Sequence, residues 1–249
     1  YCEYTMDTIG RLVMGQKESM IFQNPRVAVA QSLFLRNFDQ PLIHLNLAAP
    51  IINKVTMWSA KKFGSSLSAA EDELMAEMDK AVRERIKKRE VDNSVCAETA
   101  DFIDLFLDFA SEMAASEKTE FKMSESQVSK NLSVDEVVAQ AVIFLLAGFD
   151  TTANALGYTS WMLATHPEIL KRCREEIDEV CCDESISYEY LQNLNYVEAV
   201  CKETLRFFPL GAFANSRQCM RYTDVCGLII ENGTNVQVDT YGLHFDPAI

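Results

Sequence analysis

The longest hydrophobic pattern of the chain lies between residues 133 and 166. An apolar run from Val137 to Leu146 is broken only by Gln140, and apolar residues return after residue 152 as far as His166. Ser133 and Glu136 form a Ser-x-x-Glu capping box before this run, and the proline after His166 disfavours helix there. The pattern therefore predicts one helix of roughly 30 residues, about 45 Å long, with small, acidic and hydroxyl residues at its centre.

Helical patterns also occur on both sides of this segment. Leu74, Met78, Ala81 or Val82, and Ile86 recur at helical spacing, which predicts one buried stripe. Gly15 can end the first helix, and Pro167 suits the first turn of another. The predicted helices are Tyr4–Met14, Val27–Phe38, Leu67–Glu90, Ala100–Met113, the segment after Pro167, Leu191–Leu194 and Val197–Phe207.

Charged residues on two of these helices are predicted to form solvated faces. Arg85, Lys87, Lys88 and Arg89 close the helix Leu67–Glu90, where their positive charge suits the helix dipole. In the next helix aspartates alternate with apolar residues, and we expect the aspartates in solvent and not at a metal. The residues expected inward are Phe102, Ile103, Phe106 and Phe109, and those expected outward are Asp101, Asp104 and Asp108.

After Pro209 the pattern changes from helix to strand. Cys226-Gly227 and Asn232-Gly233 are turn signals, and Asn-Gly favours a tight hairpin. Leu228–Ile230 and Val236–Val238 flank the Asn-Gly pair, and the second alternates apolar and polar residues. We therefore predict a mainly α fold with a small antiparallel β-sheet near the C-terminus. It forms a single domain over residues 1–249, with a helical core at about 1–209 and a β-rich segment at about 210–249.

Two segments are predicted to be loops. Gln40–Ile52 is apolar and bracketed by prolines, which suits either a buried connection or a loop that touches a membrane surface. Ser116–Asn131 is polar and is expected to be an exposed loop.

Composition narrows the function classes. Lys and Arg number 23 against 37 Asp and Glu, a net charge of −14, which argues against a nucleic-acid partner. The eight cysteines lack a C-x-x-C pair, and we expect reduced thiols. Asp150 and Asn154 interrupt the best hydrophobic window, which favours a buried helix over a membrane span. Neither a signal peptide nor an anchor is visible, and both ends resemble cuts through a longer protein.

The centre of the long helix carries the first candidate site. Helical spacing gives one row of Ile143, Ala147 and Thr151 and a neighbouring row of Leu146, Asp150 and Asn154. Gly148 would let a flat ligand approach the backbone, and the hydroxyl of Thr151 can bond the carbonyl of Ala147. Asp150 and Thr151 could then relay protons to a bound reactive group. The same residues would also suit a helix kink with two satisfied polar side chains.

The second candidate is the pair Glu203 and Arg206, three residues apart on a predicted helix. A surface pair at this spacing contributes only about 0.2–0.5 kcal/mol. Glu203 is in line with apolar residues, however, and a buried pair needs further hydrogen-bond partners. Arg217 and Arg221 could supply some of them, so we expect a structural ion-pair network.

These motifs, in this order, resemble the cytochrome P-450 family. Ala-Gly-Phe-Asp-Thr-Thr at 147–152 matches the [Ala/Gly]-Gly-x-[Asp/Glu]-Thr-[Thr/Ser] signature of that family's long central helix. Glu203-Thr-Leu-Arg206 followed by Phe-Phe-Pro matches its Glu-x-x-Arg helix. The Ala164–Glu168 join and the closing His244–Pro247 fit the same order, and the resemblance covers essentially the whole chain. Tyr4–Asp7 and Phe22–Pro25 resemble the animal microsomal branch, which oxidises drugs and steroids.

The resemblance implies a partial cytochrome P-450 fold and a haem-thiolate monooxygenase. Such an enzyme inserts one oxygen atom from O2 into a small apolar organic substrate. Its electrons come from NADPH through NADPH-cytochrome P-450 reductase. The intact protein would lie on the cytoplasmic face of the endoplasmic reticulum membrane, although this segment contains no anchor. No nucleic acid would take part.

The resemblance also implies roles for individual residues. Thr151 would hydrogen-bond the bound oxygen, and Asp150 would help to deliver protons. The residues that would contact haem are Ala147, Gly148, Thr151 and, through a propionate, Arg217. Those that would line the substrate pocket are Ile143, Leu146, Ala147, Leu210, Ala212 and Phe213. Glu203 and Arg206 would hold the fold around the haem as an ion pair.

The iron ligand is the main departure from the family pattern. The family's ligand is a cysteine in a Phe-x-x-Gly-x-x-x-Cys-x-Gly loop, and none of the eight cysteines here has that context. An axial thiolate favours O–O cleavage, so we expect no metal ligand in this chain and an inactive isolated segment. Two other interpretations stay open. They are a module that binds an apolar ligand and a non-catalytic helical protein with a structural role.

Overall fold

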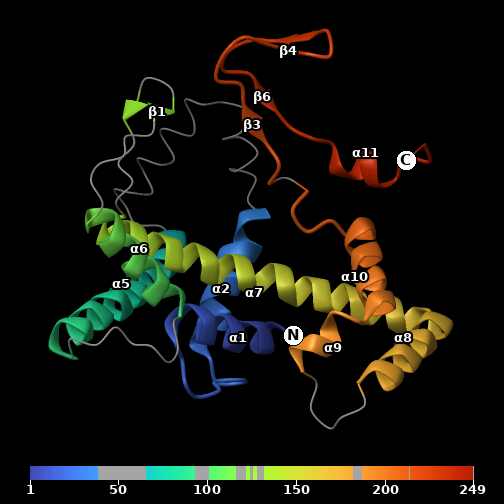
Figure 1. Cartoon of the computed structure of the whole chain (residues 1–249), viewed down its shortest axis with the longest axis horizontal. Helices are drawn as coiled ribbons and strands as arrows, with labels where there is room; N and C mark the ends of the chain where they lie inside the picture. The colour runs from blue at the N-terminus through green and yellow to red at the C-terminus, as the bar shows by residue number, and fades with distance from the viewer. Residues whose placement is uncertain are drawn as a thin grey trace. The chain divides into compact units, whose positions relative to one another are not determined.

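The computed structural model describes residues 1–38, 66–92, 101–115, 122–123, 126–127, 132–181, 187–212 and 214–248. The predictions for Gln40–Ile52 and for most of Ser116–Asn131 lie outside these residues. The chain divides into two compact units, Tyr1–Ala153 and Asn154–Ile249. The long helix α7, Val134–Thr165, passes through the boundary (Figure 1). The single domain expected over residues 1–249 stays a prediction. The expected fold class, mainly α with small antiparallel sheets near the C-terminus, is confirmed.

The first unit is built from helices that follow the predicted ones closely. Gly15 ends the first of them in the left-handed conformation, at φ 65°, as the sequence predicts. The short strands β1 and β2 pair with each other in an antiparallel manner. The elements are α1 Cys2–Met14, α2 Pro25–Phe38, α5 Ser66–Asp92, α6 Phe102–Ala115, β1 Lys122–Met123, β2 Ser126–Gln127 and the first part of α7.

Helix α7 begins at the predicted capping box. The Ser133 backbone N–H donates to the Glu136 carboxylate at 2.7 Å, and the Glu136 N–H donates to the Ser133 hydroxyl at 3.3 Å. These hydrogen bonds lower the pKa of Glu136. The helix runs for 32 residues, close to the expected length. Its length and composition would also let it cross a membrane, a property that core helices of soluble proteins share.

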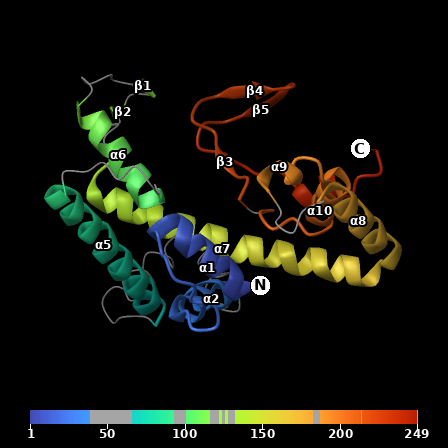
Figure 2. The same ribbon diagram turned by 60° about the horizontal axis from the view of Figure 1, so that its bottom comes forward.

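The core of the first unit forms around the first part of α7. Helices α1, α5 and α6 contribute side chains that pack against it, and these helices lie beside it in both views (Figure 2). The predicted stripe of α5 is confirmed, since Leu74, Met78 and Val82 are buried. The largest fully buried side chains are Phe149, Met6, Met78, Ile103, Leu145, Val13, Val82 and Val137.

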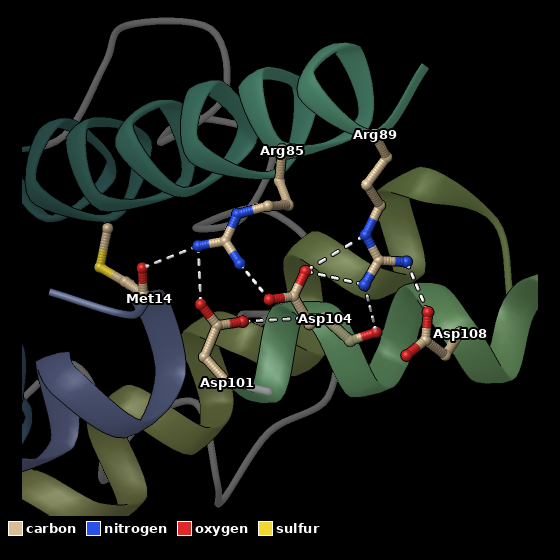
Figure 3. Close-up of polar contacts among 6 residues, drawn as sticks. All are labelled: Met14, Arg85, Arg89, Asp101, Asp104 and Asp108. Carbon is tan, nitrogen blue, oxygen red and sulfur yellow. Dashed lines mark hydrogen bonds and ion pairs between the residues drawn. The ribbon is translucent and has the colours of Figure 1, made fainter. Parts of the chain in front are cut away.

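The prediction of solvated charged faces is wrong for Arg85 and Arg89 of α5 and for Asp101 and Asp104 of α6, whereas Lys87 and Lys88 are exposed as expected. Asp101 and Asp104 are buried, and Arg85 and Arg89 of α5 reach across to them (Figure 3). Phe109, expected inward, is 48% exposed. Helical periodicity cannot distinguish an acidic face in solvent from one that meets a basic face on another helix. Here the two faces meet, and each neutralises the other.

The cluster Arg85, Arg89, Asp101, Asp104 and Asp108 therefore joins α5 to α6. Arg89 donates to Asp104 at 2.7 Å and to Asp108 at 2.6 Å, and Arg85 contacts both Asp104 and Asp101. Asp101 also caps α6, because its Oδ1 accepts the Asp104 N–H at 2.8 Å (Figure 3). Burial raises the pKa of Asp101, although the backbone N–H of Asp104 and the guanidinium of Arg85 act in the opposite direction.

The same cluster reaches the end of α1. Arg85 donates to the Met14 carbonyl at 3.3 Å, one of the carbonyls left open where α1 ends (Figure 3). Gly15 follows, and a Cβ there would collide with the Asp101 carboxylate. Glycine is thus required at this position both by its positive φ and by the ion pair that packs against it.

In its described residues the second unit contains α8, α9 and α10 after the end of α7, then short strands and the helix α11. Helices α8 and α10 pack against each other (Figure 2). The helices are α8 Pro167–Val180, α9 Tyr188–Leu191, α10 Asn195–Phe207 and α11 Thr240–His244. The strands are β3 Arg217–Gln218, β4 Thr223–Val225, β5 Leu228–Ile230 and β6 Asn235–Val236.

The predicted hairpin at Asn232-Gly233 is wrong. The segment Leu228–Ile230 pairs with β4 through the Cys226-Gly227 turn, and β6 pairs with β3. Both Cys226 and Gly227 have positive φ, at 52° and 86°, which is the requirement of a type I′ hairpin turn. At the other turn only Gly233, at φ 87°, has positive φ. The backbone conformation, and not the Asn-Gly sequence, decides which turn closes a two-residue hairpin.

Candidate functional site

The predicted row Ile143, Ala147 and Thr151 forms an exposed stripe on α7. Ile143 is 59% exposed, and Ala147 and Thr151 are also exposed, whereas Leu145 and Phe149 are completely buried. The helix is therefore core on one face and open on the other within the first unit. An exposed apolar residue followed one turn later by alanine gives a smooth surface of low relief, which suits a flat apolar group.

Thr151 makes the hydrogen bond that the sequence predicts. Its hydroxyl donates to the Ala147 carbonyl at 2.6 Å. A hydroxyl has one proton and two lone pairs, so Oγ1 can still accept a hydrogen bond from the exposed side. Asp150 precedes it on the neighbouring row and is half-buried. The stripe thus places a hydroxyl in solvent and a carboxylate next to it in sequence.

Gly148 has a different neighbour from the one that the sequence suggested. A Cβ at Gly148 would lie 2.6 Å from Cδ1 of Ile9 on α1. The missing side chain therefore makes room for the core packing of α1. Ala147 lies on the exposed stripe, and it is therefore the small residue at which a flat ligand can approach the helix backbone.

The Glu203–Arg206 pair is present on α10, with both carboxylate oxygens engaged at 2.8 Å. Hydrogen bonds from Arg206 lower the pKa of Glu203. The expectation of a buried pair is wrong, because the Glu203 side chain is 54% exposed. Glu203 lines an apolar groove beside Val200 and Thr204 while keeping more than half of its side chain exposed.

The additional partner of Arg206 is the backbone of α11. Its Nη1 donates to the His244 carbonyl at 2.7 Å, and the His244 ring Nδ1 lies 3.0 Å from the Arg206 carbonyl. The guanidinium also lies over the Phe207 ring, 4.3 Å from its centroid. Sequence reasoning proposed Arg217 and Arg221 for this role. The only available signal for His244 was its place in the closing His-Phe-Asp-Pro motif.

Arg217 lies on β3 with an exposed side chain, and its Nη1 donates to the Ser216 carbonyl at 2.8 Å. Leu210 is half-buried, and Ala212 is buried beside Thr240, whose hydroxyl donates to its carbonyl at 3.5 Å. Phe213 lies outside the described residues. These positions belong to the second unit, whereas Ile143, Leu146 and Ala147 belong to the first, and each unit is described by itself.

Haem can be tested against the described residues of the first unit. A porphyrin needs an apolar surface with a small side chain at the point of closest approach, and the stripe Ile143–Ala147–Thr151 provides one. A carboxylate or a lysine in the stripe would have contradicted this fit. The stripe contains neither, so the residues present fit the group.

Comparisons with known proteins agree with this fit. A family model described as cytochrome P450 matches residues 2–249. Two relatives from Caenorhabditis elegans carry the names cytochrome P450 CYP13A4 and CYP13A1. They are 40% identical over 260 residues and 41% identical over 259 residues. Each alignment covers 100% of this chain and 49% of the relative, so the chain spans about half the length of the curated relatives that it matches.

Proposed function

Because this chain belongs to the cytochrome P450 family, we propose that it is part of a haem-dependent monooxygenase. The protein inserts one oxygen atom from O2 into a small apolar organic substrate. Its electrons come from NADPH through a reductase, and the intact protein acts at the endoplasmic reticulum membrane. The two described units then belong to one haem domain.

The exposed stripe on α7 is the observation that carries this proposal. Helix α7 buries Phe149 and Leu145 completely in the core, and it exposes Ile143 and Ala147 on another face. An exposed apolar face of this kind suits contact with a second apolar partner. The stripe coincides with the family's signature at residues 147–152. When bound, haem supplies the iron at which molecular oxygen is reduced and cleaved. Ala147 and Ile143 give that group its apolar wall and exclude water from it.

Thr151 and Asp150 handle protons at this wall. The Thr151 hydroxyl proton is held by the Ala147 carbonyl at 2.6 Å. Rotation about the Cβ–Oγ1 bond would turn that proton from the carbonyl toward the exposed face, where it can be released, and Oγ1 would take one replacement proton in the same step, so the hydroxyl stays neutral. Asp150 is the adjacent ionisable side chain that can supply the replacement proton. Proton transfer of this kind contributes about 10²- to 10⁴-fold to a rate.

In the second unit, this proposal assigns Arg217 to a haem propionate. Arg217 has a guanidinium with five N–H donors, and the bond to Ser216 uses one of them. The remaining donors suit the carboxylate of a haem propionate. The substrate contacts that the family resemblance implies, and that this proposal keeps, are Ile143, Leu146, Ala147, Leu210, Ala212 and Phe213.

Replacement of one hydroxyl tests this proposal. In the full-length protein with its reductase, Thr151→Ala should raise the share of consumed O2 that is released as hydrogen peroxide, because proton delivery fails. Thr152→Ala is the matched control, since it removes the same group one position along the helix and off the stripe. Equal peroxide release by the two variants would remove Thr151 from proton delivery.

A further inference from the structure

Helix α10 lacks a cap of its own. Its N-cap residue is Leu194, which has no side-chain acceptor, and ψ at Leu194 is 64°, outside the extended range usual for this position. The Asn195 side-chain amide donates to the Asn193 carbonyl at 3.2 Å, and this hydrogen bond satisfies none of the first backbone N–H groups of α10. The first backbone N–H groups of a helix need an acceptor from elsewhere when its own sequence offers none.

Glu176 of α8 provides that acceptor. Its Oε1 accepts the Tyr196 N–H at 2.8 Å and its Oε2 accepts the Val197 N–H at 2.9 Å. Tyr196 and Val197 are the second and third residues of α10, the two positions that an N-cap side chain normally satisfies. The carboxylate also brings negative charge to the positive end of the helix dipole. Glu176 of α8 thus accepts the backbone N–H groups of α10 that a local N-cap side chain would otherwise accept.

Neighbouring contacts fix α10 against α8 at the same place. The Arg172 guanidinium lies over the Tyr196 ring, 4.1 Å from its centroid. An apolar groove of about 240 Å³ continues along the junction, lined among others by Ile169, Val200 and Thr204. Since Glu176 meets the start of α10 and Ile169 meets its later turns, the two helices run antiparallel. The register of this pairing is set at Glu176.

We propose that Glu176 is the N-cap of α10 in trans, and through it a positioning residue for the Glu203–Arg206 pair. Glu203 and Arg206 lie two turns further along α10, so a shift at its first turn moves both. Arg206 holds α11 through the His244 carbonyl, so the effect extends to that helix. The consequence for haem rests on the proposed function, whereas the capping role does not.

Hydrogen exchange of individual backbone amides tests the capping role. In Glu176→Ala the Tyr196 and Val197 amides should exchange about tenfold faster, because both acceptors are lost. In Glu176→Gln, which keeps the size and one acceptor oxygen, the increase should be smaller but clear. Glu175→Gln is the matched control, since Glu175 is exposed and pairs only weakly with Lys171 at 3.8 Å. If the Tyr196 and Val197 amides of Glu176→Ala exchange at the wild-type rate, the capping role is refuted.

Haem retention in the full-length protein tests the positioning role. Glu176→Gln should transfer haem to a scavenger protein several-fold faster than Glu175→Gln. Unchanged transfer with faster exchange at Tyr196 would refute the positioning role and leave the cap. A full-length protein that holds no haem would instead refute the proposed function, and amide exchange would still decide whether Glu176 is the cap.

Discussion

Replacement of Asp104 by asparagine tests whether the charged cluster between α5 and α6 stabilises the first unit. Asp104 is 4% exposed and accepts hydrogen bonds from both Arg85 and Arg89. Asp104→Asn keeps the size but leaves two guanidinium groups without their shared carboxylate. Removing one partner of a buried pair costs about 3–5 kcal/mol. Because the arginines keep 25% and 27% of their side-chain surface exposed, we expect the low end, about 3 kcal/mol.

Urea denaturation of the two variants Asp104→Asn and Asp108→Asn measures this difference. Asp108 lies one turn later on the same helix, its side chain is 42% exposed, and it forms an ion pair with Arg89. Its replacement should therefore lower the free energy of unfolding by at most about 1 kcal/mol. In thermal unfolding of the same variants, the melting temperature should fall by about 6–12 °C for Asp104→Asn, at about 2–4 °C per kcal/mol. Equal losses in the two variants would show that burial of Asp104 gives the cluster no additional strength.

Two further predictions concern the packing and titration of the first unit. Gly148→Ala should cost about 1–3 kcal/mol, because its Cβ would meet Ile9, and Ile9→Ala should relieve part of that loss. Gly157→Ala, where nothing lies within 4 Å, should be neutral or stabilising in the same thermal assay, and an equal loss would refute the collision. A hydrogen bond from the Met20 N–H lowers the pKa of Asp7 in the folded protein. The ionised Asp7 therefore adds to the free energy of unfolding above the unfolded-state pKa of about 3.9, and this stabilisation is lost as the pH falls below that value. Asp7→Asn should flatten the acid limb of stability against pH, and an unchanged limb would contradict this linkage.

The sequence predicted what depends on local pattern. The capping box at Ser133 and the hydrogen bond from Thr151 to Ala147 follow from residues within four positions of one another. The length of α7 follows from the local signals at its two ends. Helix boundaries were close for the same reason, since periodicity and caps are local properties. Helical spacing also predicted that Ile143, Ala147 and Thr151 share one face of α7, but spacing alone did not show that this face is exposed.

Contacts between distant segments could not be predicted in this way. Asp104 and Arg89 lie 15 residues apart, and each looks like an ordinary surface charge on its own helix. Glu176 lies 20 residues before Tyr196, and no rule of local capping connects them. Likewise the partner of Arg206, His244, is 38 residues away. In each case the partner lies on another element, where local sequence rules do not reach.

The most direct test of the central claim is the absorption spectrum of the full-length protein, reduced and exposed to carbon monoxide. A haem held by a cysteine thiolate gives a Soret band strongly shifted to longer wavelength, and we predict this band. A protein that incorporates no haem, or that shows the unshifted band of a haem without thiolate, would contradict the monooxygenase assignment.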